Sequence, residues 1–149
     1  MYTHILISTD GSKLAQTGVD HGLSLAKALG SKVTIVTATE PMPIPSVATA
    51  AGWVATPVDF EGYDASQKKF ANEILSPVKA FAEKMGLEAD TLHVPDAWAA
   101  GAIVDAAQKL ECNLIVMASH GRRGIKRLLL GSQAAEVIAT SVIPVLVVR

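Results

Sequence analysis

Residues 114–132 read LIVMASHGRRGIKRLLLGS, and this stretch predicts the architecture of the whole chain. Its first four residues, 114–117, are apolar and lead into small residues, as in a parallel strand covered on both faces. A basic loop with glycines follows and closes at Gly131. Beyond it, apolar residues recur at helical spacing, so we expect Ser132 to be the first residue of a helix.

The order strand, glycine loop, helix is typical of a site that holds phosphate. A helix N-terminus has unpaired backbone N–H groups and partial positive charge, and glycines let the backbone approach an anion closely. Two well-known phosphate loops do not fit. A Walker loop needs a lysine after its last glycine, where this chain has Ser132, and the dinucleotide fingerprint needs three glycines, where Gly121 and Gly124 supply only G-x-x-G.

The stretch resembles the nucleotide loop of the universal stress protein family, G-x2-G-x9-G-[ST], aligned on Ala118, Gly121, Gly131 and Ser132. Further blocks of the chain are similar to that family in the same order: HILISTDGS at the start, VMASHG, LLLGS, and VIPVLVV at the end. Ala118 departs from the pattern. A methyl group there narrows the space for phosphate and disfavours a positive φ that glycine tolerates, which bears on nucleotide binding and not on the fold.

Composition bounds the class of protein. A chain of 149 residues is expected to form one domain with a full core. Half of it is hydrophobic and 18% is charged, against about a quarter charged in an average chain, which favours self-association. The net charge of −1 argues against a dedicated nucleic-acid or anionic-membrane binder. The N-terminal sequence has no signal-peptide pattern and no apolar run reaches about 18 residues, so we expect a cytoplasmic protein.

Apolar periodicity predicts alternating strands and helices. We expect strands at residues 4–9, 32–39, 87–94, 112–117 and 143–148, and helices at residues 14–29, 63–85, 98–110 and from 132 onward. This alternation predicts a single doubly wound α/β domain, a five-stranded parallel sheet with helices on both faces. The resemblance implies the strand order 3-2-1-4-5. Ligands then bind at the carboxyl ends of the first and fourth strands, where the order reverses.

Residues 40–62 contain four of the seven prolines and show no strand or helix period. We expect a long loop whose apolar residues, Trp53 among them, pack on the domain. It either closes over the adenosine side of the site as a lid or is a passive cover. Elsewhere, Pro77 is expected to kink or end its helix, Trp98 to pack in the third helix, and Cys112 to be a buried hydrophobe.

The candidate site residues follow from the loop and the sheet edge. Asp10 is expected to cap a helix, to contact the ligand, or to do both. Ser132 has the same two possible roles. His120 is expected to form hydrogen bonds and not to act as an acid or base. The basic side chains of the loop, Arg122, Arg123, Lys126 and Arg127, partly screen phosphate charge and are partly solvated. The resemblance implies a nucleotide site made of Thr9, Asp10, Ala38, Met117, Ala118, His120, Gly121, Gly131, Ser132 and Gln133.

These observations predict a nucleotide-binding regulator. The resemblance implies ATP or AMP, with any Mg²⁺ arriving with the nucleotide, and an unidentified protein partner. We expect no enzyme activity beyond slow hydrolysis of bound ATP. The apolar strand at residues 143–148 is expected at a sheet edge, where it pairs with its twin in a homodimer. The alternatives are a stress protein that acts through protein contacts alone, as Ala118 permits, and less favourably a nucleic-acid binder.

Overall fold

The computed structural model describes residues 1–121 and 130–149, which form an α/β domain around one five-stranded parallel sheet. The order across the sheet is β5-β2-β1-β6-β7, which confirms the predicted order 3-2-1-4-5 once its strands are counted along the chain. Strand β1 pairs in parallel with β2 on one side and with β6 on the other. The strands are β1 (His4–Ser8), β2 (Lys32–Ala38), β5 (Ala89–Val94), β6 (Leu114–Ala118) and β7 (Val145–Val148).

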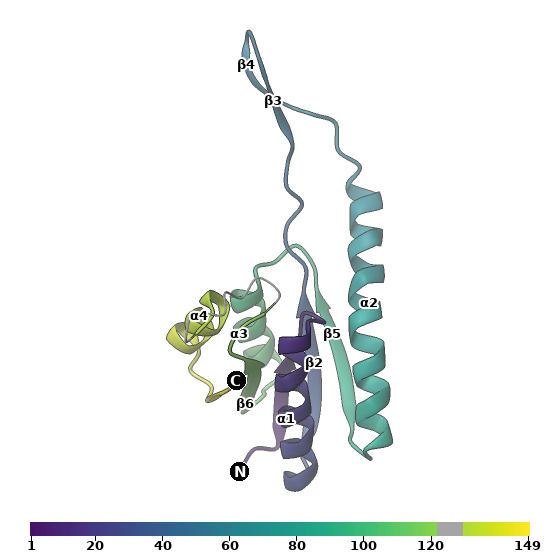
Figure 1. The fold of residues 1–149 in the computed structure, drawn as a ribbon, viewed down its shortest axis with the longest axis vertical. Helices are drawn as coiled ribbons and strands as arrows, with labels where there is room; N and C mark the ends of the chain where they lie inside the picture. Colours follow the sequence, from purple (N-terminus) through teal and green to yellow (C-terminus); the bar gives the residue numbers. More distant parts are fainter. Residues whose placement is uncertain (122–129) are drawn as a thin grey trace.

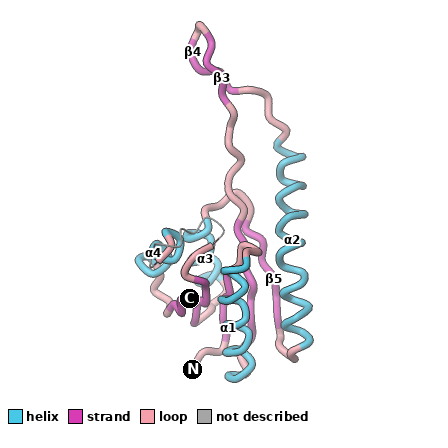
Figure 2. Tube along the Cα trace, in the orientation of Figure 1, coloured by secondary structure: helices cyan, strands magenta, loops and turns pink. Residues whose placement is uncertain are grey.

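Helices cover both faces of the sheet (Figures 1 and 2). Alternate residues of β1 point to opposite faces, so Ile5 and Ile7 pack with Leu23 in one core, whereas Leu6 packs with Ile103 in the other. All five side chains are at most 5% exposed, which explains the continuous apolar runs of the strands. The helices are α1 (Lys13–Leu29) and α2 (Phe60–Lys84) on the first face, and α3 (Ala99–Lys109) and α4 (Ser132–Thr140) on the second.

The ends of the first two helices show where local sequence sets structure. The Ser12 hydroxyl accepts a hydrogen bond from the Ala15 N–H at the start of α1, and Gly30 ends this helix with φ +68°, a left-handed conformation that favours glycine. Helix α2 begins at Phe60, earlier than predicted, because the Asp59 carboxylate caps it by accepting from the Gly62 N–H. It then runs through Pro77 without ending.

Residues 40–62 were predicted as a loop packed on the domain, and that prediction was wrong. They form an antiparallel hairpin of β3 (Ser46–Thr49) and β4 (Gly52–Ala55), followed by the start of α2. The hairpin projects away from the sheet (Figure 1). Its apolar side chains are exposed, Trp53 by 76% and Val47 by 53%. Short four-residue strands and prolines in both flanking segments hide the period of two that marks longer strands.

Two smaller predictions have opposite outcomes. Trp98 does not pack in α3 but precedes its first residue and is 62% exposed, because the helix begins one position later than expected. Cys112 is buried as predicted, and burial raises the pKa of its thiol to about 11, against a smaller lowering by Lys32. No helix in the described part of the chain is long and apolar enough to cross a membrane.

Candidate functional site

Asp10 and the glycine loop meet at the carboxyl edge of the sheet, as predicted. A Cβ placed on Gly121 would lie 2.7 Å from Asp10 Oδ2, so this glycine leaves room for the carboxylate. The other carboxylate oxygen, Oδ1, accepts from the Ser12 N–H at 2.9 Å. The Thr9 hydroxyl accepts from the Gly11 N–H at 3.2 Å. The carboxyl ends of β1 and β6, distant in sequence, thus lie side by side at the edge where doubly wound folds have their ligand crevice.

Gly131 joins the glycine loop to α4 through a close backbone contact. Its N–H donates to the Ser119 carbonyl at 2.7 Å, and a Cβ at this position would lie 2.8 Å from the same oxygen. Its φ of −70° is open to any residue, so the contact, and not the dihedral angle, requires glycine. Gly131 also occupies the N-cap position, so Ser132 is the first residue of the helix as predicted, but of its two expected roles, cap and ligand contact, the cap is excluded.

The N-terminus of α4 has no side-chain cap. Ser132 is the first helical residue, and no described side chain accepts a hydrogen bond at the cap. Gln133, expected at the nucleotide, instead accepts from the Ala100 N–H at 2.9 Å and serves the first turn of the neighbouring α3. The spacing of residues in the sequence does not predict this contact between the starts of α3 and α4. Like those of any helix start, the first N–H groups of α4 have no partner within the helix, and no described side chain caps them.

His120 is the second group in the crevice whose hydrogen bonding is incomplete. Its Nδ1 lies 3.1 Å from the Ser119 hydroxyl. Its Nε2 is buried and has no hydrogen-bond partner in the part of the chain that the structure describes. A buried polar atom without a partner is costly, so such an atom in a crevice is a candidate ligand contact. The contact of Nδ1 with the Ser119 hydroxyl agrees with the prediction that His120 forms hydrogen bonds.

Ala118 lies in a regular strand and creates no backbone strain. It pairs with Val148 of β7 and does not belong to the residues with positive φ. A Cβ on Gly18 of α1 would lie 2.8 Å from the Ala118 amide nitrogen, so the helix backbone packs directly on this strand end. Met117 is buried in the core, and Ala38 is the last residue of β2 at the same sheet edge.

The predicted cations Arg122, Arg123, Lys126 and Arg127 lie outside the described residues.

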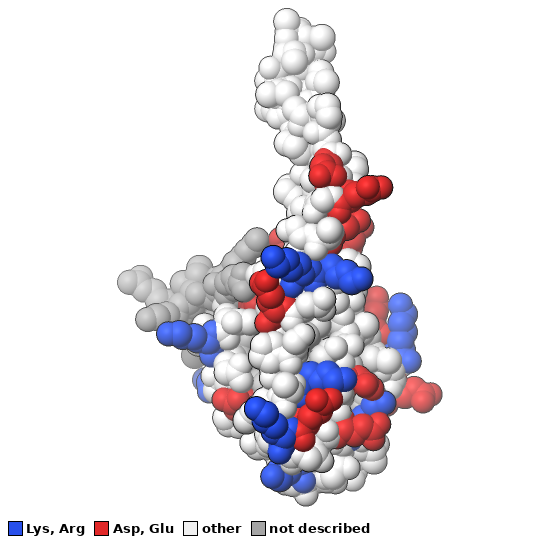
Figure 3. Space-filling view, turned by 90° about the vertical axis from the view of Figure 1, so that its right-hand side faces the viewer, with Lys and Arg blue, Asp and Glu red and all other residues white. Residues whose placement is uncertain are grey.

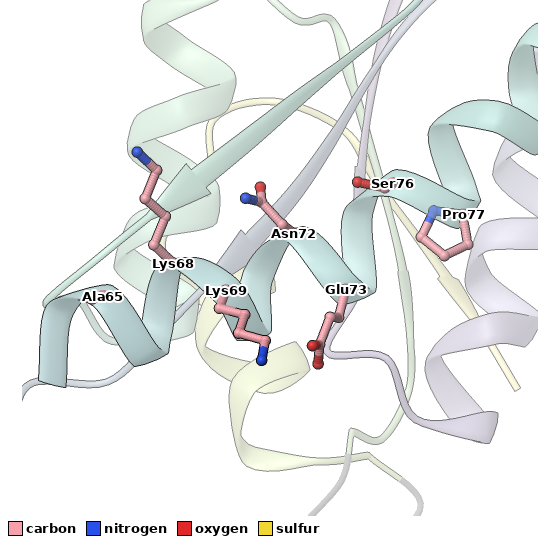
Figure 4. Close-up of a pocket in the computed structure, with 7 residues that line it drawn as sticks. All are labelled: Ala65, Lys68, Lys69, Asn72, Glu73, Ser76 and Pro77. Carbon is pink, nitrogen blue, oxygen red and sulfur yellow. The ribbon is translucent and has the colours of Figure 1, made fainter. Parts of the chain in front are cut away.

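A surface depression lies away from this site, along α2 (Figure 4). Its volume is about 720 Å³, and none of the predicted nucleotide residues lines it. Because a single exposed helix supplies all of its lining, it is a hollow on the surface and not an enclosed ligand cavity. No group of three or more metal-ligating side chains occurs among residues 1–121 and 130–149. The lining residues are Ala65, Lys68, Lys69, Asn72, Glu73, Ser76 and Pro77.

Known structures share this fold. The universal stress protein UspA from Lactobacillus plantarum superposes with a TM-score of 0.79 at 20% identity, covering 99% of this chain and 98% of that one. A universal stress protein in complex with cAMP has a TM-score of 0.67 at 25% identity, covering 99% and 97%. One from Archaeoglobus fulgidus in complex with dAMP has a TM-score of 0.68 at 21% identity, covering 99% and 98%.

Sequence comparison gives the same assignment. A universal stress protein of Methanocaldococcus jannaschii is 32% identical over all of this chain and 83% of its own length. Universal stress protein YxiE of Bacillus subtilis is 29% identical over the full length of both. The profile of the Universal stress protein family (Usp) matches residues 1–149. The resemblance noted in the glycine loop therefore extends to the entire sequence, and this chain belongs to the universal stress protein family.

Proposed function

We propose that this protein binds an adenine nucleotide, ATP or AMP, in the crevice between β1 and β6. One observation carries the proposal: polar groups without a hydrogen-bond partner among the described residues lie beside Gly131. These are the uncapped N-terminus of α4 and the buried His120 Nε2, for which the described residues provide no hydrogen-bond partner. A phosphate group supplies acceptor oxygens for the helix N–H groups and, in the tautomer with the proton on Nε2, for His120.

The residues divide the nucleotide into two parts. The phosphates lie at the α4 N-terminus, against the backbone N–H groups of Ser132 and Gln133, the Ser132 hydroxyl and His120. The adenosine lies toward Asp10, whose carboxylate is a suitable acceptor for a ribose hydroxyl, with Ala38 and Ala118 at the adjacent strand ends. Mg²⁺ accompanies ATP and needs no protein cage of its own.

The related structures support the same ligand class. The two relatives in complex with cAMP and dAMP hold nucleotides that share an adenine base and a single phosphate group. The proposed role is that of a cytoplasmic regulator. Nucleotide binding changes the surface that an unidentified partner protein binds. Turnover of bound ATP is at most slow.

Identification of bound nucleotide tests this proposal directly. The purified protein is denatured with acid, and released nucleotide is identified by chromatography and mass spectrometry. Nucleotide-free protein is then titrated with ATP and with adenosine in a calorimeter. We expect ATP to bind at least tenfold more tightly, because adenosine has no phosphate for the α4 N-terminus. The absence of both released nucleotide and ATP binding would favour the alternative function, through protein contacts alone.

We further propose that β7 pairs with its twin in a homodimer. It is the last strand at one edge of the sheet, and its Leu146 is 39% exposed. An apolar edge strand tends to pair with another chain unless it is covered. Leu146→Lys should weaken this dimer, as measured by light scattering at micromolar concentration. A monomeric mass for the unmodified protein would exclude this interface.

A further inference from the structure

The hairpin arm, residues 41–58, is an apolar projection whose strands β3 and β4 are exposed in the described part of the structure. It contains no charged residue. Val47 pairs with Val54 on one face of its ribbon, and Ala48 pairs with Trp53 on the other, so both faces are apolar. Ile44, Val54 and Trp53 are 64%, 51% and 76% exposed. An isolated two-stranded hairpin is marginally stable in water, and exposed apolar patches usually mark interaction sites.

Prolines hold the arm away from the domain. Pro41, Pro43 and Pro45 alternate in the ascending segment, and Pro57 lies in the descending one. Proline fixes φ and favours extended backbone, so little conformational entropy is lost when the arm is held extended. The same stiffness opposes the bend that a lid would need to close over the domain. The space-filling view shows it as an uncharged projection with acidic side chains at its base (Figure 3).

The start of α2 carries a charge pattern that is complementary to itself. Asp59, Glu61 and Asp64 are followed one to two turns later by Lys68 and Lys69. No ion pair joins the last four of these to any described residue. Two such helices packed antiparallel about Ala65 bring Glu61 level with Lys69 of the other copy, because each lies four positions from Ala65.

From these observations we propose that the arm docks on a second copy of this chain, along the second copy's α2. The two helices cross antiparallel at the depression that begins at Ala65, and each arm continues along the partner helix past Ser76. The lengths agree. Residues 41–49 reach at most about 30 Å when extended. The stretch of α2 from Ala65 to Lys84 is about 28 Å long.

A membrane surface fits the arm less well than a second copy. The acidic side chains at its base repel anionic lipid headgroups. The same acidic side chains are attracted by the lysines of a second α2. The proposed contact is also separate from the β7 edge, since α2 covers the sheet near β5 and β2. Both interfaces together would give an assembly larger than a dimer.

Cross-linking between different copies is the first test. Val54→Cys protein is mixed with Ser76→Cys protein and treated with a bis-maleimide reagent, with buried Cys112 remaining unreactive. We expect cross-linked dimers in this mixture and none when Ser76→Cys is replaced by Leu29→Cys, at the end of α1. Dimers cross-linked only between two Val54→Cys copies would overturn the proposal, as would co-sedimentation of a monomeric protein with phosphatidylcholine vesicles.

Charge reversal is the second test, with association measured by analytical ultracentrifugation in a Leu146→Lys background. Trp53→Lys should abolish the remaining association, and the control Leu29→Lys should not. Glu61→Lys and Lys69→Glu should each weaken it roughly threefold to tenfold, and the double variant should restore it to within about twofold. A monomeric Leu146→Lys protein, or a double variant no better than the single ones, would overturn the proposal.

Discussion

The two longest connections that leave the carboxyl edge of the sheet run in opposite directions, one back to the domain and one away from it. The β6 to α4 connection returns to the domain at both of its described ends, where Gly121 lies against Asp10 and Gly131 against the Ser119 carbonyl. The β2 to α2 connection runs outward and exposes Trp53. The first is held by the close backbone contact of Gly131, which leaves no room for a side chain, and the second is stiffened by prolines. The two connections thus differ in the residues that fix their course, although both contain many apolar residues.

Gly131→Val should give the largest effect. Its side chain would collide with the Ser119 carbonyl, 2.8 Å from the position of a Cβ, and displace the loop from α4. We expect ATP affinity to fall about 100-fold or more, equivalent to about 2.7 kcal/mol. Calorimetric titration measures it, and thermal unfolding verifies the fold. The control is Gly101→Val, where no atom lies within 4 Å of the added Cβ. Unchanged affinity in Gly131→Val would mean that this stretch only connects a strand to a helix.

His120→Ala should follow, with ATP affinity lowered roughly 10-fold to 100-fold. The reason is the loss of a hydrogen bond to a charged phosphate, worth about 1.5–3 kcal/mol. The stability of the nucleotide-free protein should fall by no more than about 0.5–1.5 kcal/mol, the worth of one hydrogen bond, because only Nδ1, 3.1 Å from the Ser119 hydroxyl, has a partner among the described residues. His21→Ala, on the exposed face of α1, is the matched control. Lower stability with normal affinity would assign His120 a purely structural role.

Ser132→Ala should have a smaller effect than either change, about 2-fold to 10-fold in ATP affinity. It removes one hydroxyl contact and leaves the backbone N–H groups of α4 in place. Since Gly131 and not Ser132 occupies the N-cap, helix stability should change by less than about 0.5 kcal/mol. Adenosine binding should be less sensitive to this change than ATP binding. A loss equal to that of Gly131→Val would show that the hydroxyl, and not the helix N-terminus, dominates phosphate binding.

Removal of the arm should have the smallest effect on nucleotide affinity. Replacement of residues 44–56 by Gly-Ser-Gly should change ATP affinity less than about twofold, because the arm projects away from the sheet. Amide exchange in β3 and β4 should likewise be unchanged under saturating ATP, while that at the α4 N-terminus slows. Slower exchange in the arm, together with a loss of affinity on its removal, would restore the lid that the sequence suggested.

The sequence by itself determined the five-stranded sheet and its helices, and it predicted where the candidate site lies. Apolar runs and helical periodicity are local, so the five strands and their order with the helices could be read from residues such as those of 114–117. Local backbone rules also placed the end of α1 at Gly30, whose φ is +68°. The family loop then pointed to Asp10 and Gly121, which the structure brings together.

Only the tertiary structure decided which partners these residues contact. Gln133 turns to the start of α3 instead of the crevice, and Gly131 is required by a carbonyl 12 positions earlier in the chain. Such contacts join segments far apart in sequence, and no periodicity within either segment encodes them.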